Sequence, residues 1–103
     1  MLCVDYREKI QYNDDKPGKV ALSETGHSRS TLWCLGPGQR IEPHVHAGDH
    51  IWAGFEGGGL FLSEGRSPQP IGPGTVLVAP AGGSHGVENT GGEGLVFLSV
   101  SAG

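Results

Sequence analysis

Glycine and proline, the residues that most often form turns, recur along the whole of this sequence and divide it into short pieces. Nineteen glycines and seven prolines together make up about a quarter of the 103 residues. Helical periodicity is absent from about residue 30 onward, so only the opening dozen residues could hold a helical turn. Eight apolar runs of strand length lie between the turns, at residues 19–22, 30–35, 39–46, 50–55, 60–63, 75–79, 85–89 and 95–101. Short strands at this spacing predict an all-β sandwich or barrel.

A chain so rich in glycine and proline approaches the composition of disordered proteins, and its apolar content decides against disorder. Leucine, isoleucine, valine and phenylalanine supply 24 of the 103 residues, above the roughly 20% below which disorder is expected. Only 17% of the residues are charged, so charge repulsion does not hold the chain open. The length predicts a single domain that spans residues 1–103.

Charge and cysteine content exclude several classes of protein. No apolar run approaches the roughly 18 residues of a membrane span, and the first ten residues lack the apolar core of a signal peptide. Two cysteines, Cys3 and Cys34, are too few for a disulfide framework. The net charge of −4 and the scattering of the seven basic residues exclude an ordinary nucleic-acid surface. We therefore expect a cytoplasmic protein that binds neither membranes nor nucleic acids.

Four of the five histidines form a pattern. His44 and His46 are separated by one residue, so on a strand both side chains point to the same face and two imidazoles can share a metal ion. His50 follows four residues later, and the proline and glycine around it favour a bend that returns its side chain to the same pocket. His85 lies far along the chain, and His27 lies apart in a polar loop.

Two longer spacings contain these four histidines. The first reads Gly38, five residues, His44-Val45-His46, three residues, His50, six residues and Gly57. The second reads Gly74, five residues, Pro80-Ala81-Gly82, two residues, His85, three residues and Asn89. Both match the sequence motifs of the cupin family, and the sequence resembles a small cupin over about half of its length. The one departure is His50, where the family usually has glutamate.

The resemblance implies a cupin domain folded as a double-stranded β-helix, or jelly-roll barrel, around one divalent transition metal ion. His44, His46, His50 and His85 align with the family's ligands, which are usually three histidines and one glutamate. Imidazole is a ligand for Mn, Fe, Ni, Cu, Co and Zn, so each of these metals is a candidate. Four neutral histidines leave a divalent site at about +2, one unit above the usual set, which favours an anionic or chelating oxygen ligand.

A second copy of the chain is the expected protein partner. Strands such as residues 51–55 are apolar on both faces, which suggests that the outside of the barrel is covered. The resemblance to cupins, which commonly dimerise, implies a homodimer.

Alternation along the strands selects candidates for the wall of the pocket. Trp52 lies two residues after His50, and Glu42 lies two residues before His44, so each shares a strand face with a histidine. Trp52 is equally well explained as filling of the barrel. Glu42 is the one acid/base candidate, although the proline that follows it can disturb the alternation and leave it solvated.

Two glycines do not mark turns. Gly54 and Gly86 lie within strands, close to the histidines in sequence. We expect their missing side chains to leave room for a ligand.

Three functions are open at this point. A four-histidine metal site with open coordination positions and a largely apolar wall favours a metalloenzyme of dioxygenase or oxidoreductase type that acts on a small organic substrate. The first alternative is a metal-dependent isomerase, lyase or cyclase, which needs a general base such as Glu42. The second alternative is a non-enzymatic module that binds or senses a small molecule.

Overall fold

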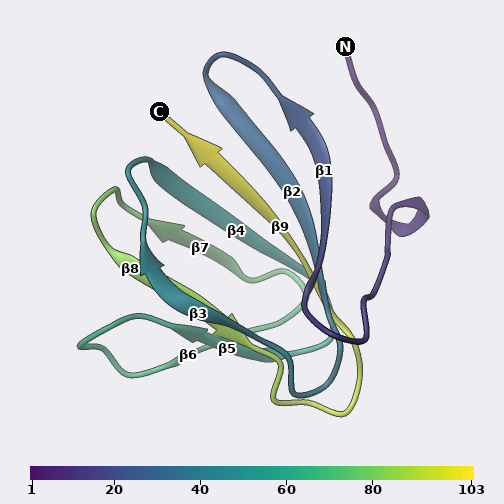
Figure 1. Ribbon diagram of the computed structural model, residues 1–103, viewed down its shortest axis with the longest axis vertical. Coiled ribbons are helices and arrows are strands. Elements are labelled where there is room, and N and C mark those ends of the chain that lie inside the picture. The colour runs from purple at the N-terminus through teal and green to yellow at the C-terminus, as the bar shows by residue number, and fades with distance from the viewer.

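The structure is a computed structural model that describes residues 1–103, and its strands pair in antiparallel fashion within two sheets. One sheet has five strands in the order β1-β2-β9-β4-β7, and the other has four in the order β3-β8-β5-β6. The two sheets lie against each other as the layers of a jelly roll (Figure 1). The elements are η1 (Tyr6–Glu8), β1 (Gly18–Glu24), β2 (Ser28–Leu35), β3 (Arg40–Val45), β4 (Asp49–Glu56), β5 (Gly59–Leu62), β6 (Gln69–Ile71), β7 (Val76–Ala79), β8 (Ser84–Glu88) and β9 (Leu95–Ala102).

The predicted all-β jelly roll, or double-stranded β-helix, is confirmed. Each of the eight apolar runs falls on a strand, and the helical turn expected near the start is η1, a short 3-10 helix. The sequence pattern missed β6, an edge strand that contains Pro70. Proline cannot donate a backbone hydrogen bond and is therefore tolerated in edge strands, which makes such strands resemble turns. Ile71, which is buried, is the one side chain that could have revealed it.

The main hydrophobic core lies between the two sheets. Its buried side chains come from both layers: Leu35, Trp52, Ile71, Val87, Leu95 and Phe97. Phe97 of β9 packs beside Trp52 of β4, with the two rings tilted and their centroids 5.1 Å apart. Because strand residues alternate between faces, Leu95 and Phe97 of β9 both point into this core, whereas Val96 between them points to the other face of the sheet.

The outer face of the five-stranded sheet is also apolar, as the sequence predicts. Leu32, Cys34 and Val96 form a second buried cluster there. The amino-terminal segment covers this cluster: Tyr6 packs on Phe55 with ring centroids 4.4 Å apart. The Tyr6 hydroxyl donates a hydrogen bond to Glu56, which ends β4. Burial raises the pKa of the Cys34 thiol, and neither cysteine forms a disulfide.

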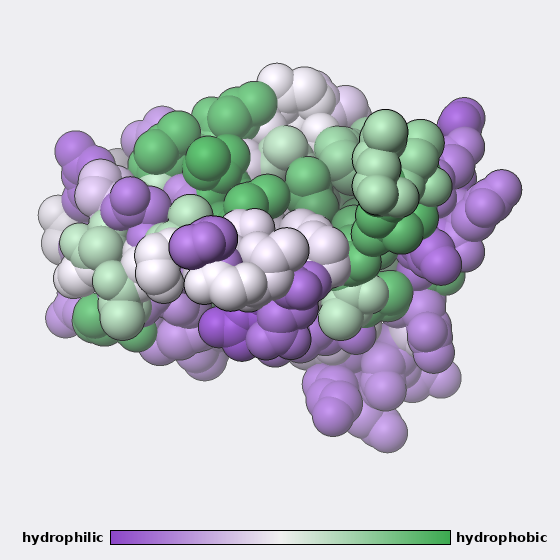
Figure 2. All heavy atoms as spheres, turned by 90° about the horizontal axis from the view of Figure 1, so that it is seen from above, coloured by the Kyte–Doolittle hydropathy of each residue, from purple (hydrophilic) through white to green (hydrophobic).

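Beyond this covered cluster, the same face stays open. Ile51 of β4 and Val76 and Val78 of β7 are exposed, and Ile51 pairs directly with Val78 across the strands. On the face seen in Figure 2, hydrophobic surface gathers mainly in the upper part of the view and hydrophilic surface mainly along the lower edge and at the two ends. None of the structure's helices has the length and apolar character needed to cross a membrane.

The expectation that Gly54 and Gly86 leave room for a ligand is wrong. A side chain on Gly54 would meet the backbone oxygen of Gly72, and one on Gly86 would meet the backbone of Ile41 and Pro43. Both glycines therefore permit close approach of two backbone segments, which a Cβ would prevent. Gly86 thereby allows β3 to lie tightly against β8.

Candidate metal centre

The four motif histidines come together where the two sheets meet. His44 lies on β3 and His85 opposite it on β8, as a cross-strand pair. His50 lies on β4 of the other sheet, and His46 lies in the loop that joins β3 to β4. The His46 ring is central, with its centroid 4.1 Å from that of His44, 3.9 Å from that of His50 and 5.1 Å from that of His85.

Backbone hydrogen bonds hold the two histidine-bearing segments together. The Gly82 N–H donates to the His46 carbonyl at 2.9 Å, and the Ala81 N–H donates to the Asp49 carboxylate at 2.9 Å. The turn before β8 is thereby fastened to the loop before β4. Gly82 has a φ of +85°, a conformation that favours glycine, which explains the glycine of the second motif. Sequence reasoning missed Asp49, although a carboxylate between two motif histidines is a signal for such a positioning role.

Three of the four imidazoles, those of His46, His50 and His85, are held in the neutral form. Burial, followed by the neighbouring His50, His44 and His85, lowers the pKa of His46 to about 4. Burial is also the main cause that lowers the pKa of His50 and of His85. A neutral imidazole keeps one nitrogen lone pair, which is the form that binds metal ions.

His44 is oriented by a backbone contact. Its Nδ1 lies 2.9 Å from the carbonyl oxygen of Glu42. Because a carbonyl only accepts, Nδ1 carries the hydrogen, and the lone pair of the neutral ring is on Nε2. Metal-binding histidines commonly donate their second ring nitrogen to a carbonyl in this way.

Three buried ring nitrogens in the cluster have no hydrogen-bond partner: His46 Nε2, His50 Nδ1 and His85 Nε2. Each buried polar atom left unpaired costs on the order of 1–3 kcal/mol, so three in one place suggest a missing partner. With the side chains in their present rotamers, no group of three or more His, Cys, Asp or Glu residues is arranged to hold a metal ion. The rings must therefore rotate about their side-chain bonds to share an ion, and the donor set of neutral imidazoles fits a divalent transition metal.

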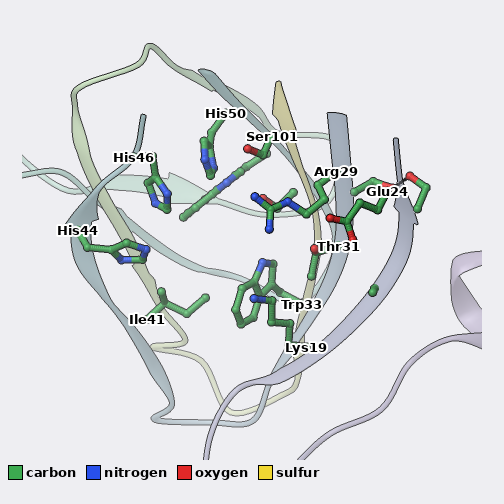
Figure 3. A pocket seen from close by; sticks show the side chains of 15 residues that line it. Lys19, Glu24, Arg29, Thr31, Trp33, Ile41, His44, His46, His50 and Ser101 are labelled. Carbon is green, nitrogen blue, oxygen red and sulfur yellow. Dashed lines mark hydrogen bonds between the residues drawn. The ribbon is translucent and has the colours of Figure 1, made fainter. Parts of the chain in front are cut away.

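A cavity of about 570 Å³ opens beside the histidines. Figure 3 shows His44, His46 and His50 on one side of it and Arg29, Thr31, Trp33 and Lys19 on the other. The wall also carries the hydroxyls of Ser23, Ser30, Ser99 and Ser101. His85 lines a neighbouring cavity of about 720 Å³. Sequence reasoning missed the two cations and the serines, because their shared face depends on strand pairing across the sheet.

The two candidates for the pocket wall differ in placement. Trp52 lines the cavity and is buried. Glu42 does not line it: this residue is exposed, and its carboxylate accepts a hydrogen bond from Arg40 at 2.8 Å. The pairing of β3 with β8 shifts between Ile41 and His44, so alternation is interrupted there and Glu42 does not share the histidine face. Glu42 therefore offers no general base to the cavity in this arrangement.

Comparison with known proteins decides the family. The cupin domain family matches residues 31–101, about two thirds of the chain, and the match includes all four clustered histidines. The chain belongs to the cupin family. Among curated proteins, this cupin is similar to a protein of Thermotoga maritima named oxalate-binding protein, with 36% identity over 102 residues, covering 90% of this chain and 84% of the relative.

Solved structures agree with this assignment of the fold. The TT1209 protein of Thermus thermophilus superposes on this cupin with a TM-score of 0.92 and 31% identity, covering 99% of this chain and 97% of that one. An uncharacterised conserved protein of Klebsiella pneumoniae with a double-stranded β-helix domain gives a TM-score of 0.91 and 28% identity, covering 97% and 88%.

Acid should destabilise the metal-free protein. In the unfolded chain His46 regains its ordinary pKa of 6.5, whereas in the folded protein its pKa is about 4. Between these values the unfolded chain binds more protons, so the free energy of unfolding decreases as the pH falls from about 6.5 towards 4. The lowered pKa values of His50 and His85 act in the same direction. Urea unfolding of chelator-treated protein over this range measures the effect.

The His46→Gln variant is the control for this pH dependence. Glutamine does not titrate, so the free energy of unfolding should change less steeply with pH than in the parent protein. Equal slopes in the two proteins would contradict the assignment of a lowered pKa to His46.

Proposed function

We propose that this cupin binds one divalent transition metal ion through His44, His46, His50 and His85, and through that ion a small chelating organic acid. The observation that carries the proposal is the group of three buried imidazole nitrogens without a partner, beside a cavity. The metal is one of Mn, Fe, Ni, Cu, Co and Zn, all of which accept imidazole.

The metal ion, the imidazoles and the residues of the cavity wall would each contribute a different property to ligand binding. A bound ion would supply Lewis acidity, which attracts and orients ligand oxygens. The neutral imidazoles add no negative charge, so a divalent site would keep a charge of about +2 and favour an anion. Hydroxyls of the serines on the wall are able to donate hydrogen bonds to ligand oxygens, and Trp52, which belongs to the hydrophobic core, supplies an apolar part of the wall.

The nature of the ligand has two supports. The cavity wall includes two cationic residues, Lys19 and Arg29, and one carboxylate, Glu24. The Thermotoga relative, 36% identical, is named for binding oxalate, a small chelating dianion. Both favour a small organic acid, and the name of the relative supports the non-enzymatic binding module among the three functions.

The two enzymatic alternatives differ in whether they need a general base among the residues that line the cavity. An isomerase, lyase or cyclase needs a general base, and Glu42 lies outside the cavity. A dioxygenase or other oxidoreductase needs no base from the chain, because the metal is its main reactive group. Oxygen consumption is therefore the measurement that separates an oxidoreductase from a binding module.

The metal content should depend on the clustered histidines. We expect about one metal ion per chain in purified protein reconstituted with zinc, and a large loss in the His46→Ala variant, which removes the central ring. Elemental analysis after desalting gives the ratio. His27→Ala is the matched control, because His27 is exposed and lies outside the cluster. A full metal content in His46→Ala, or an equal loss in both variants, would contradict the proposed site.

Oxalate binding should require the metal and its charge. Calorimetry should detect oxalate binding to zinc-loaded protein and not to metal-free protein. The His50→Glu variant should keep its metal, as the usual cupin ligand set does, but a site charge lowered by one should weaken oxalate about tenfold or more. Unchanged affinity with the metal retained would contradict the electrostatic argument. Oxygen uptake by iron-loaded protein with oxalate would instead support an oxidoreductase.

We also propose that the chain forms a homodimer through the open part of the outer sheet face. Its support is the exposure of Ile51, Val76 and Val78 on neighbouring strands, which is unusual for a face in contact with water. A second copy offers the same apolar strip, so a two-fold interface would bury both at once.

A negative charge introduced into this apolar strip should dissociate the proposed homodimer into single chains. Light scattering of eluting protein should give twice the chain mass for the parent and the single chain mass for Val78→Glu, because a dimer would bury the new carboxylate. The control is Val45→Glu, which changes an equally exposed valine on the other sheet. A monomeric parent protein, or dissociation by both variants, would exclude this interface.

A further inference from the structure

Two cations face the cavity without an anionic partner. Lys19 on β1 and Arg29 on β2 both line it, and neither takes part in the three ion pairs of the chain. Glu24 is the cross-strand neighbour of Arg29, yet no ion pair joins them. The chain as a whole carries a net charge of −4, whereas this wall carries two cations and one anion. Positive charge is therefore concentrated where a ligand would enter.

Strand register places Arg29 in line with the histidine cluster. Arg29 of β2 pairs with Ser101 of β9, and Ser101 pairs with His50 of β4. Paired residues point to the same face of a sheet, so these three side chains form one row across the inner surface. Neighbouring strands lie about 4.8 Å apart, which puts the Arg29 and His50 backbones roughly 10 Å from each other.

The side chain of Arg29 points along this row. Figure 3 shows its guanidinium directed into the cavity, towards the side that carries His46 and His50. The Arg29 charge is also among the causes that lower the pKa of His50, which agrees with this proximity. Ser101, the residue between them in the row, also lines the cavity.

Lys19 lies farther from the cluster. It pairs across the strands with Trp33, and its ammonium lies 5.3 Å from the centre of the Trp33 ring. A contact of this kind occupies the lysine with an aromatic face. Arg29 is thus the free cation nearer to the histidines, and its planar guanidinium suits bidentate binding of a carboxylate.

The cavity is larger than oxalate needs. Its volume of about 570 Å³ lies within the roughly 300–1,000 Å³ of cavities that hold drug-sized ligands. Oxalate has two directly joined carboxylates, and both would be used in chelation at the histidine cluster. A ligand that also reaches Arg29 must carry a second acidic group at a distance from its chelating end.

We propose that Arg29 is a specificity-determining residue that binds the distal carboxylate of a dicarboxylic acid longer than oxalate, whose other end chelates at the histidine cluster. This inference rests on the proposed function, because it takes the histidine cluster as the site of chelation. It adds the substrate class: small acids with a chelating 2-oxo or 2-hydroxy carboxylate at one end and a second carboxylate at the other.

Two acids of equal carbon number test the inference. Both 2-oxoglutarate and 2-oxovalerate carry the same chelating end, and only the first has a distal carboxylate. Calorimetry on zinc-loaded protein should show 2-oxoglutarate binding about tenfold or more tightly, as expected for a hydrogen-bonded ion pair. In Arg29→Gln this preference should disappear, with the affinity for 2-oxovalerate unchanged.

Lys9→Gln is the matched control, since it changes the net charge by the same amount at an exposed residue outside the cavity. It should keep the full preference. Unchanged binding of 2-oxovalerate by Arg29→Gln also shows that the variant is folded and metal-loaded. Equal binding of the two acids by the parent, or equal weakening of both by Arg29→Gln, would overturn the role of Arg29. Failure of both acids and of oxalate to bind zinc-loaded protein would instead overturn the proposed function.

Discussion

Four imidazoles packed together at the meeting point of two sheets are the constraint on which the site depends. The His46 ring lies next to the other three rings, and burial lowers its pKa to about 4, so His46 stays neutral near pH 7. Three buried imidazole nitrogens of the cluster are left without a hydrogen bond. Buried polar groups in folded proteins normally have a partner, and neutral imidazoles are good ligands for divalent transition metals, which is the basis of the proposed metal site.

The rest of the fold serves to hold these rings against one another. Gly86 allows β3 to lie against β8, which pairs His44 with His85. Hydrogen bonds from Gly82 and Ala81 fasten the turn before β8 to the loop that carries His46. The core around Trp52 and Phe97 then fixes the distance between the sheets. The polar cluster is thus built from backbone contacts and an apolar core, and its own side chains contribute few hydrogen bonds.

The sequence predicted most of the strands and the histidine cluster, and it failed where the structure depends on irregular strand pairing or on contacts between distant segments. Turn residues and apolar runs predicted eight of the nine strands, and β6 escaped because its proline resembles a turn. Motif spacing predicted which four histidines lie together. Alternation made Trp52 a candidate for the cavity wall or the barrel core, and it belongs to both. Alternation failed for Glu42, because the irregular pairing of β3 interrupts it. Gly54 and Gly86 were misjudged because a close backbone approach involves a partner distant in sequence.

The sequence by itself determined the all-β architecture, which follows from residue types at short spacings, and the histidine set, which follows from the two spacings that match the cupin motifs. Only the tertiary structure decided what faces those histidines. β9 is the last strand of the chain, yet it lies between β2 and β4 and so joins Arg29, Ser101 and His50 in one row. Such a row depends on the register of strands far apart in the chain, which no local pattern encodes. The charge of the cavity is therefore a property of the folded sheet.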